Sequence, residues 1–440
     1  MDNSHIKHNI LIIGGGGREH AVGWKVKQSP RCGALYFAPG NAGTAQLGSN
    51  VALEATDILG LIDFAKANNV TMTLALPDDP LALGIVDAFK AVGLRIFGPT
   101  QEASQLESSK AFAKHFMETH NLPTAAFKTV TSYPAALHYL SETQNYPIVI
   151  KASGLALGKG VVICQDISEA TQVLQDMLVN KTFGDAGSVV VIEEFMTGPE
   201  ISVHAFSDGV THTLFPISQD HKKIGEGDTG LNTGGMGTIT PVPFVDQDLI
   251  NTIETTIVAP TFEAMKQASI PFEGILYPGL MLTPTGPKLL EYNARFGDPE
   301  TQIYMRLLET DLVDIFDACI DKKLHLVDIK WSKLSACNIV LASGGYPGKY
   351  EKGKIITGIE EAEMDPDIKV FHAGTMRGGA QDSNENIRGK LMTNGGRVLG
   401  VSAVGATLAE ALAKAYAAIP KISFEGMQYR TDIGKKALGQ

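Results

Sequence analysis

The stretch NILIIGGGGREHAVGWKV, residues 9–26, runs from an apolar strand through four consecutive glycines into a helical pattern. The sequence then continues to alternate between strand and helix patterns, at 33–41, 57–68, 70–77, 81–92 and 94–99. Strands that alternate with helices are typical of a parallel, doubly wound sheet. We therefore expect such a domain at the start of the chain, ending near Thr100.

The glycine turn does not match a dinucleotide fingerprint, which needs Gly-x-Gly-x-x-Gly and an acid after the second strand. Gly14 and Gly16 fit, but Glu19 takes the third place and the second strand ends in APGN, 38–41. The turn can still bind a phosphate at the start of its helix, or it can simply pack the helix on the sheet. We expect a phosphate or phosphosugar site here rather than a nicotinamide site.

Composition limits the classes of protein that this chain can belong to. At 440 residues, 44% hydrophobic and 19% charged, it is expected to fold into roughly two to four soluble domains. A formal net charge of −11 argues against a nucleic-acid surface. The four cysteines are far apart and show no metal spacing, which predicts free thiols and a cytoplasmic setting. No apolar run is long enough to span a membrane, and the first residues do not resemble a signal peptide.

A second glycine-rich stretch, KASGLALGKGV at 151–161, joins two strand patterns and predicts an antiparallel flap over a site. A P-loop needs four residues between its glycines and a Ser or Thr after the lysine. Here three residues separate Gly154 from Gly158, and Gly160 follows Lys159. Free backbone N–H groups and two lysines nevertheless suit a polyphosphate. The alternative is that Lys151 is a solvated strand end.

Acidic residues follow the next apolar strand, in VIEEFMTGPE at 191–200. Glu193 and Glu194 end the strand, and Glu200 comes after a turn. Such acids are often merely solvated, but they can also accept hydrogen bonds from an adenine amino group and ribose hydroxyls. The stretch GEGDTGLNTGGMG at 225–237, called the glycine loop below, is interpreted as a substrate-contacting loop rather than a linker.

The stretch LLEYNARFGDPETQ, residues 289–302, ends a predicted β-hairpin over 273–295. Period two places Glu291, Asn293 and Arg295 on one face of the strand. A carboxylate and an amide supply the hard oxygens that Mg²⁺ prefers, and an arginine can bind a phosphate in a bidentate way. Gly297, Asp298 and Pro299 then form a turn that holds this face. The alternative is an exposed strand face with mixed polar residues.

Together these motifs resemble the ATP-grasp ligases, and most closely the phosphoribosylamine–glycine ligase family. The resemblance covers nearly the whole chain. It is carried by GGGGREHA, APGNAGTA, FGPT, QLESSKAF, GLALGKGV, SQDHK, DTGLNTGGMG, EYNARFGDPETQ, GGYPG, FHAGT, TNGGRVL and RTDIG, in that order.

The resemblance implies an α/β and α+β multidomain fold. A parallel doubly wound sheet over 1–103 would bind phosphoribosylamine. An ATP-grasp domain over 104–325 would carry a mobile flap at about 124–195, and a mixed α/β domain would fill 326–440. The implied reaction joins glycine and 5-phosphoribosylamine with ATP and Mg²⁺ or Mn²⁺, through glycyl phosphate. The implied protein is cytoplasmic and a monomer or weak homodimer, with small-molecule substrates and without a nucleic-acid or membrane partner.

The resemblance also assigns residues. Glu291 and Asn293 would hold the metal. Catalytic roles would fall to Arg295, Asp220 and Lys159. ATP would contact Lys110, Lys151, Gly154, Gly158, Lys159, Gly160, Glu193, Glu194, Phe195 and Glu200. The other substrates would contact Gly16, Gly17, Arg18, Glu19, Asn41, Asp78, Asp228, Asn232, Thr233, Gly234 and Gly235.

The chain departs from the family pattern in three places. The usual Gly-Pro-Glu is Leu76-Pro77-Asp78, the usual Ala-Asp-Gly has Ser153 in place of Asp, and the first turn lacks its Asn. These departures motivate one alternative to the implied ligase of purine synthesis, and a second alternative comes from another class of protein. One is an ATP-grasp ligase with a different amine or carboxylate, and the other is a non-catalytic ATP-binding module.

Overall fold

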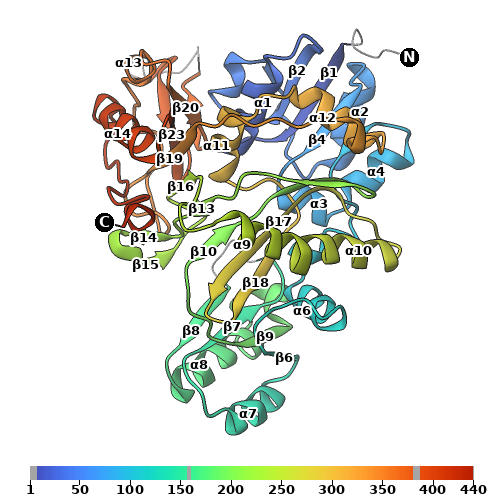
Figure 1. The fold of residues 1–440 in the computed structure, drawn as a ribbon. Coiled ribbons are helices and arrows are strands. Elements are labelled where there is room, and N and C mark those ends of the chain that lie inside the picture. The colour runs from blue at the N-terminus through green and yellow to red at the C-terminus, as the bar shows by residue number, and fades with distance from the viewer. Residues whose placement is uncertain (1–6, 156–159, 380–386, 440) are drawn as a thin grey trace.

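The structure is a computed structural model that describes residues 7–155, 160–379 and 387–439. Most of its strands belong to three five-stranded sheets and one four-stranded sheet. The amino- and carboxy-terminal sheets lie beside each other, and the four-stranded sheet forms a smaller lobe on the opposite side of the molecule (Figure 1). The expected ATP contacts at Gly158 and Lys159 lie outside the described residues. None of the helices in the described ranges is long and apolar enough to cross a membrane.

The amino-terminal part is a five-stranded sheet in the order β3-β2-β1-β4-β5, and every pairing in it is parallel. The prediction of a parallel, doubly wound domain is therefore confirmed. Its strands are β1 (His8–Gly14), β2 (Cys32–Pro39), β3 (Ser49–Asn50), β4 (Met72–Ala75) and β5 (Ile96–Phe97). Its helices are α1 (Gly17–Val26), α2 (Ile58–Ala67), α3 (Asp78–Ala82) and α4 (Ile85–Ala91), with a short 3-10 turn at Thr44–Gln46.

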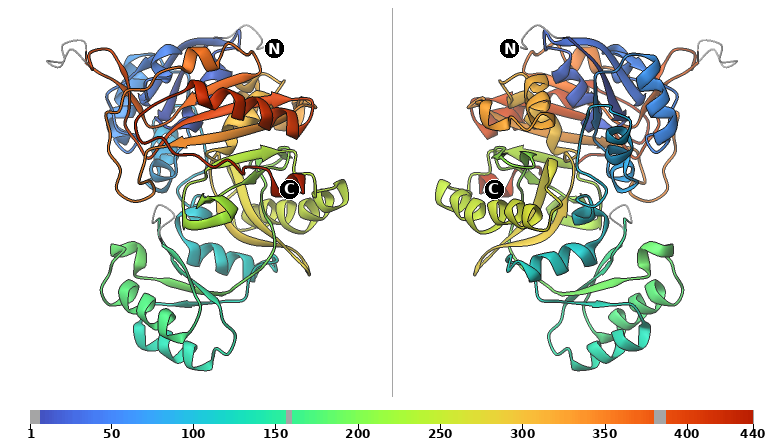
Figure 2. Two further views of the ribbon diagram at one scale, coloured as in Figure 1. Left: turned by 90° about the vertical axis from the view of Figure 1, so that its left-hand side faces the viewer. Right: turned by 90° about the vertical axis from the view of Figure 1, so that its right-hand side faces the viewer.

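The smaller lobe is a four-stranded antiparallel sheet with the order β6-β9-β7-β8. The two strands on either side of the 151–161 stretch pair antiparallel, as expected for a flap. Both side views show this lobe standing apart from the rest of the chain (Figure 2). Its elements are β6 (Phe127–Val130), α7 (Tyr133–Glu142), β7 (Ile148–Ala152), β8 (Val161–Cys164), α8 (Ile167–Leu178) and β9 (Val190–Glu194).

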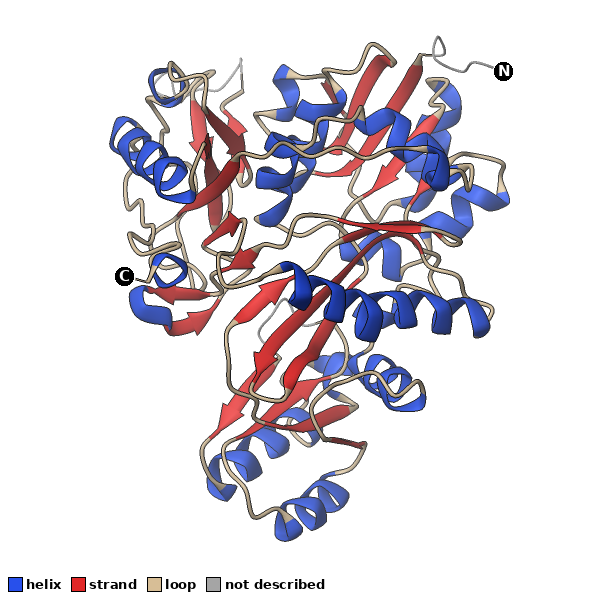
Figure 3. Cartoon of the chain, in the orientation of Figure 1, coloured by secondary structure: helices blue, strands red, loops and turns tan. Residues whose placement is uncertain are grey.

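The third sheet, which is antiparallel, lies between the lobe and the two domains at the top of the view (Figure 3). Its longest strands, β17 (Glu273–Thr283) and β18 (Gly286–Asn293), form the predicted hairpin. The pairing shifts by one residue between Gly279–Glu291 and Leu280–Leu289, so Leu290 is an extra residue on β18. The other strands are β10 (Glu200–Ser202), β11 (Ala205–Asp208) and β12 (His212–Leu214). The helices of this part are α5 (Gln105–Ser108), α6 (Lys110–Thr119), α9 (Gln247–Ile253), α10 (Ala259–Gln267), α11 (Glu300–Leu307) and α12 (Leu312–Ile320).

The carboxy-terminal sheet has the order β13-β16-β19-β23-β20. Two of its strands, β13 (Gln219–Asp220) and β16 (Gly237–Thr240), come from well before residue 326, so the sheet joins chain segments on both sides of that position. The rest are β19 (Ser335–Ala342), β20 (Ile368–His372) and β23 (Arg397–Gly405), with α13 (Ile359–Ala362) and α14 (Leu408–Ala418). Two short ribbons pair β14 (Lys223–Gly225) with β15 (Thr229–Asn232) and β21 (Thr375–Arg377) with β22 (Leu391–Thr393).

Two helical patterns that read as single helices are each interrupted. The pattern at 101–120 breaks at Ser109, whose extended backbone and hydroxyl cap the start of α6 by accepting from the Phe112 N–H. The pattern at 81–92 breaks at Gly84, where φ is +83°. A glycine tolerates this left-handed conformation, so the chain can turn there. The periodicity of the sequence predicts one continuous helix over 81–92 and another over 101–120, and both predictions are wrong.

One hydrophobic core connects the amino-terminal sheet to the rest of the molecule. Phe296 lies at its centre, 1% exposed, and directly follows the predicted phosphate-binding Arg295. Its ring centroid is 6.1 Å from Phe206 of β11, 6.3 Å from Phe316 of α12 and 6.4 Å from Phe97 of β5. Both tryptophans of the chain pack against the same cluster. The core therefore fixes the backbone on which the predicted metal strand ends.

We predict that Phe296→Ala lowers the free energy of unfolding by about 3–5 kcal/mol, because it leaves a cavity among aromatic side chains. Urea unfolding followed by tryptophan fluorescence will measure this core directly. The control Phe244→Ala removes a ring that is 41% exposed and should have little effect. Equal losses in the two variants would contradict the prediction.

Candidate active site

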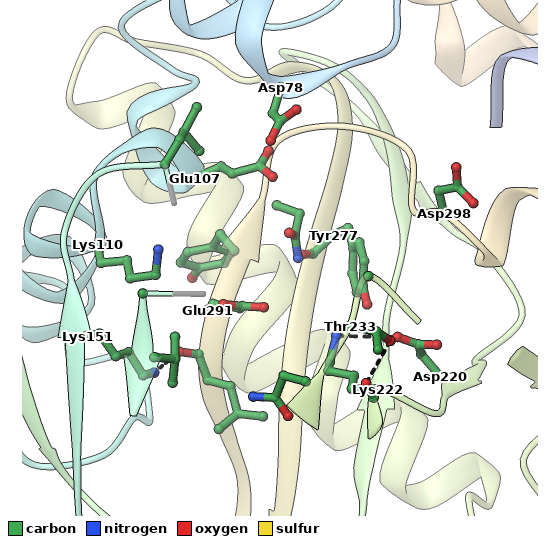
Figure 4. A pocket seen from close by; sticks show the side chains of 18 of the residues that line it. Asp78, Glu107, Lys110, Lys151, Asp220, Lys222, Thr233, Tyr277, Glu291 and Asp298 are labelled. Carbon is green, nitrogen blue, oxygen red and sulfur yellow. Dashed lines mark hydrogen bonds and ion pairs between the residues drawn. The ribbon is translucent and has the colours of Figure 1, made fainter. Parts of the chain in front are cut away.

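A cavity of about 520 Å³ opens where the lobe, the central hairpin and the carboxy-terminal domain meet, and a second cavity of about 250 Å³ adjoins it. The two share several lining residues, among them Lys151, Glu193, Asp220, Lys222 and Glu291. Figure 4 shows Glu291 near the middle, with lysines on both sides. The cavities are therefore two parts of one cleft, and its walls carry alternating charges.

The predicted metal face ends β18 and points into this cleft. Glu291, Asn293 and Arg295 all line the larger cavity. Leu290 lines it as well, because the bulge at this position interrupts the strict alternation of side chains. Opposite Glu291 stands Gly279, where an added Cβ would lie 3.6 Å from the Glu291 Cγ. That distance is an ordinary van der Waals contact, so the position of the Glu291 side chain does not require a glycine at residue 279.

The carboxylate oxygens of Glu291 are available to a ligand. Among the described residues, nothing donates a hydrogen bond to its side chain or forms an ion pair with it. Burial raises the pKa of Glu291, but the surrounding lysines and Arg295 more than offset this and lower it below its ordinary value. The group is therefore an ionised, unpaired acceptor inside a ring of cations.

Asn293 and Arg295 are held beside Glu291 by direct contacts. The Arg295 Nη2 donates to the Asn293 Oδ1 at 3.0 Å and lies 2.8 Å from the Glu107 Oε1. The Asn293 Nδ2 donates to the Tyr277 carbonyl at 3.3 Å, which leaves its oxygen facing the cleft side. The Arg295 Nε is buried without a partner among the described residues. Arg295 thus contacts both the Asn293 amide and a second carboxylate, that of Glu107.

A divalent cation fits this donor set. Glu291 and the Asn293 Oδ1 are hard oxygen ligands, as Mg²⁺ and Ca²⁺ prefer, and Asn293 would exchange its bond with Arg295. Within the described ranges, no group of three or more His, Cys, Asp or Glu could hold a metal alone. A cation held by two protein ligands would complete its coordination with water and substrate oxygens, which is how Mg²⁺ usually binds phosphates.

Glu193 is buried between two lysines. Its Oε1 lies 2.9 Å from the Lys151 Nζ and its Oε2 lies 3.0 Å from the Lys114 Nζ. Lys114 also donates to the Thr124 hydroxyl at 2.7 Å. Burial, with a contribution from Lys151, lowers the pKa of Lys114 to about 8. The carboxylate is thus engaged as a counter-ion for the two lysines, which places the Lys151 ammonium at the cleft.

The smaller cavity has many apolar side chains in its walls and, besides the acids that it shares with the larger cavity, two acids of its own. Val149, Ile163, Phe195, Met196, Met281 and Leu290 line it. Glu194 and Glu200 stand at its edge, and Glu194 accepts from the Ala126 N–H at 3.1 Å. A flat apolar slot edged by backbone and carboxylates suits a purine ring and a sugar. The lysines that are predicted to bind phosphate lie next to it, and Lys151 lines both cavities, so a nucleotide can span the two.

Asp220 and Glu300 form a second acidic group under the cleft. Glu300 is buried and accepts from the Tyr277 hydroxyl at 2.6 Å and the Ser202 hydroxyl at 3.1 Å. Burial and the neighbouring Glu300 raise the pKa of Asp220 to about 7, although Lys222, 3.5 Å away, opposes this. Asp220 can therefore change protonation state near neutral pH.

The glycine loop reaches the cleft at Asn232, Thr233 and Gly234. The Thr233 hydroxyl donates to the Lys222 carbonyl at 2.8 Å, which ties the end of the loop to its start. From the carboxy-terminal domain, Arg397 Nη1 donates to the Gly234 carbonyl at 2.5 Å and the Asp298 carbonyl at 2.6 Å. The carboxy-terminal domain therefore completes the site.

The amino-terminal domain contributes Arg18 and Asp78 to the larger cavity. Glu19 is buried and accepts from the Gly16 N–H at 2.6 Å and from the Arg18 Nε at 2.7 Å. Asn41 is also buried, and its Nδ2 donates to the carbonyls of Gly15 and His372, each at 2.9 Å. Glu19 and Asn41 thus shape the first turn from behind.

The structure brings most of the predicted residues to the two cavities. The residues on their walls are Arg18, Asp78, Lys110, Lys151, Gly160, Glu193, Glu194, Phe195, Glu200, Asp220, Asn232, Thr233, Gly234, Glu291, Asn293 and Arg295. Seven others do not line either cavity: Gly16, Gly17, Glu19, Asn41, Gly154, Asp228 and Gly235.

Several lining residues were missed by the sequence analysis, among them Glu107, Lys114, Lys222, Tyr277, Asp298, Glu300, Tyr346 and Arg397. Most of them belong to quoted motifs, as Lys222 does to SQDHK and Arg397 to TNGGRVL. That membership was the available signal. It did not show which motif residues face the cleft.

The departure at residue 76 concerns the core. Leu76 is 1% exposed and packs in the largest hydrophobic cluster. Asp78 begins α3 and does line the cavity. Leu76 therefore does not line the cavity. Of the two departures in this segment, only Asp78 lies on the cavity wall.

Comparisons with known proteins agree across the chain. Models of the phosphoribosylglycinamide synthetase N domain, ATP-grasp (A) domain and C domain match residues 8–107, 108–301 and 336–436. The phosphoribosylamine–glycine ligase of Vibrio vulnificus is 48% identical over 98% of this chain and 99% of its own length.

Solved structures give the same result. The phosphoribosylamine–glycine ligase of Thermotoga maritima is 33% identical, with a TM-score of 0.82 over 96% of this chain and 99% of that chain. The biotin carboxylase domain of the Hydrogenobacter thermophilus 2-oxoglutarate carboxylase, solved with MgADP, has a TM-score of 0.71 over 97% of this chain and 92% of that chain. At 13% identity, the second likeness is one of fold alone.

We predict a pH-dependent stability that originates at Asp220. The folded state holds a proton up to about pH 7 that an ordinary aspartate releases near 3.8, so the free energy of unfolding falls as pH rises through this window. Asp220→Asn should remove that part of the slope. Urea unfolding across the window measures it, with the exposed Asp63→Asn as control. An unchanged slope in Asp220→Asn would show that the proton is held elsewhere.

Proposed function

The chain belongs to the phosphoribosylglycinamide synthetase family, and from this premise we propose how its residues carry out the family's reaction. The protein is a ligase of purine biosynthesis that joins glycine to 5-phosphoribosylamine and gives glycinamide ribonucleotide, with ATP converted to ADP and phosphate. The first of the three alternatives from the sequence is therefore confirmed.

The proposal depends on one observation, the unpaired Glu291 carboxylate inside a ring of cations. A carboxylate is a poor acyl donor, and phosphorylation makes it a good one. In the proposed sequence, a glycine carboxylate oxygen attacks the γ-phosphorus of ATP and ADP leaves. The amine of phosphoribosylamine then attacks the acyl carbon of glycyl phosphate, phosphate leaves, and the nitrogen loses a proton. Such chemistry requires positioning and charge neutralisation rather than a covalent nucleophile.

We place the nucleotide across both cavities. The adenine would occupy the apolar slot against the backbone of Phe195, and Glu200 would accept from the ribose hydroxyls. Lys110 and Lys151 would neutralise the phosphates, with the predicted Lys159 beside them. Glu193 would act through Lys151, whose ammonium it holds 2.9 Å away, rather than through the adenine amino group. Glu291 and Asn293 would hold Mg²⁺ or Mn²⁺, which supplies positive charge to the phosphates.

The acceptor side would lie between Asp220 and the amino-terminal domain. Arg295 would stabilise the transferring phosphoryl group, next to the Glu107 carboxylate that orients it. Arg18 and Asp78 would contact phosphoribosylamine. Asp220, with its pKa raised to about 7, is suited to accept the proton that the attacking amine loses. The flap would exclude water, because an acyl phosphate hydrolyses readily.

We further propose that the functional units follow the sequence expectation: 1–103, 104–325 with its flap at about 124–195, and 326–440. The small-molecule substrates are glycine and 5-phosphoribosylamine. We place the protein in the cytoplasm as a monomer or weak homodimer.

The direct test is ADP release by the purified protein with ATP, Mg²⁺ and glycine, with and without freshly generated phosphoribosylamine. We expect turnover that needs both substrates, with glycinamide ribonucleotide found by mass spectrometry. ATP binding without amine-dependent turnover would contradict the acceptor assignment and direct attention to Asp78.

We predict that Glu291→Ala lowers kcat at least a hundredfold, on the order of what loss of a key charge-stabilising group costs. The fold should persist, since no hydrogen bond within the described chain depends on this carboxylate. Initial rates of ADP release and circular dichroism check both parts. Glu142→Ala, an exposed acid on α7, serves as the control. Near-normal turnover in Glu291→Ala would rule out the metal assignment.

A further inference from the structure

The tip of the glycine loop, residues 226–228, does not line either cavity and is held by residues near the carboxyl end of the sequence. The C-terminal clamp, residues 430–436, contacts the loop through a buried arginine. Arg430 is 2% exposed, and it is among the largest fully buried side chains of the protein. Its Nη1 donates to the Asp228 Oδ1 at 2.9 Å and to the Lys223 carbonyl at 3.1 Å. A guanidinium is thus buried where the loop leaves the body of the protein.

Arg430 is oriented by a second acid of the clamp. Its Nε and Nη2 donate to the two oxygens of Asp432 at 2.8 and 2.7 Å. The Asp432 Oδ2 also accepts from the Gly227 N–H at 2.8 Å. Although burial raises it, contacts with Arg430 lower the pKa of Asp432 to about 2, so the pair is ionised at neutral pH. Bidentate pairing of this kind fixes geometry as well as charge.

The neighbouring residues add further bonds to the same loop. The Thr431 hydroxyl donates to the Glu226 Oε1 at 2.5 Å, and Lys436 Nζ donates to the Asp228 Oδ2 at 2.5 Å. The Gly434 N–H donates to the His221 Nε2 at 3.1 Å, and the His221 Nδ1 lies 3.1 Å from the Gly237 carbonyl. The clamp therefore holds the tip of the loop and also the histidine that joins its two ends.

Besides the clamp, the loop is held at its cleft end by Lys222, Tyr346 and Arg397, whereas its outer part is exposed. Thr229, Gly230, Leu231 and Asn232 are all exposed, and β14 and β15 pair only with each other. A two-stranded ribbon alone is marginally stable in water. Its far end carries Asn232, Thr233 and Gly234 into the cleft. The position of those residues then depends on the clamp at the tip together with the contacts of Lys222, Tyr346 and Arg397 at the cleft end.

We propose that Arg430 is a positioning residue for ligation, which holds the glycine loop so that Thr233 and Gly234 meet the acceptor substrates without itself touching them. This rests on the proposed function of the cleft. It also assigns a role to Asp228, which was expected to bind substrate: it is the anchor of the loop to the clamp.

Hydrogen exchange tests the clamp independently of activity. In Arg430→Met, peptides that cover 225–237 should exchange faster, because the ribbon loses its anchor. Lys414→Met is the matched control, since Lys414 pairs with Asp367 and Glu410 of the same domain and does not contact the loop. Unchanged exchange over 225–237 in Arg430→Met would overturn the proposal, even if the variant lost catalytic activity.

Kinetics then tests positioning against a merely structural role. We expect Arg430→Met to lower kcat/KM for glycine and phosphoribosylamine by roughly tenfold to a hundredfold, as misplacement of a contact residue does. The Kd for ATP, measured by calorimetry, should stay at the wild-type value. Equal losses in ATP binding and ligation would overturn the proposal, because they indicate general unfolding. A wild type without amine-dependent turnover would instead contradict the proposed function.

Asp228→Asn keeps the test decisive if Arg430→Met does not fold. Its side chain is 39% exposed, so the substitution should be tolerated. It should reproduce the faster exchange and the loss of kcat/KM in the same direction. Where both variants fold, Arg430→Met with Asp228→Asn should lose no more than Arg430→Met alone, since the two residues act as one unit. Additive losses would show that they act separately.

Discussion

The structure depends on bringing many charges into one partly buried cleft without leaving them unmatched. Isolated charges are costly to bury, and a buried pair is stable only when its remaining hydrogen-bonding groups are satisfied. Glu193 is the ion-pair partner of Lys114 and Lys151, and Glu107 is the ion-pair partner of Arg295. Glu291 has no such partner: among the described residues its side chain makes no hydrogen bond or ion pair, although, despite its burial, Lys222, Lys110, Lys151 and Arg295 together lower its pKa. That imbalance is where a cation and phosphates can be accommodated.

The same requirement explains why four parts of the chain meet at the site. The lobe supplies Lys151, the hairpin supplies Glu291, the amino-terminal domain supplies Arg18 and the carboxy-terminal domain supplies Arg397. None of these parts could by itself enclose a triphosphate, an amino acid and a phosphosugar. The aromatic core around Phe296 and the contacts of Arg397 hold three of them together, while the lobe projects from the rest of the molecule and contacts the hairpin through Lys151.

Much of this could be predicted from local sequence. Period-two alternation located the hairpin, and the strand-turn-helix pattern at 9–26 identified the parallel sheet. Lys151 was found because it ends an apolar strand just before a glycine loop, and Asn293 was found because period two places it on one face with Glu291 and Arg295. Lys114 and Lys222 were missed because nothing in an ordinary helix or strand pattern shows which lysine faces the cleft. Lys114 becomes a site residue only when β9 places Glu193 3.0 Å from its ammonium.

The sequence by itself determined the types of chemistry present: a parallel sheet with a phosphate-suited turn, a flap, and a strand ending in Glu291, Asn293 and Arg295. These are properties of neighbouring residues, so periodicity and turn chemistry carry them. Only the tertiary structure decided how these groups are used. Asp228 contacts Arg430, which lies more than two hundred residues later in the chain. Leu76 is buried in the hydrophobic core. The tertiary structure also raised the pKa of Asp220 by burying it near Glu300. Burial and long-range pairing set those roles, and neither is visible in a stretch of adjacent residues.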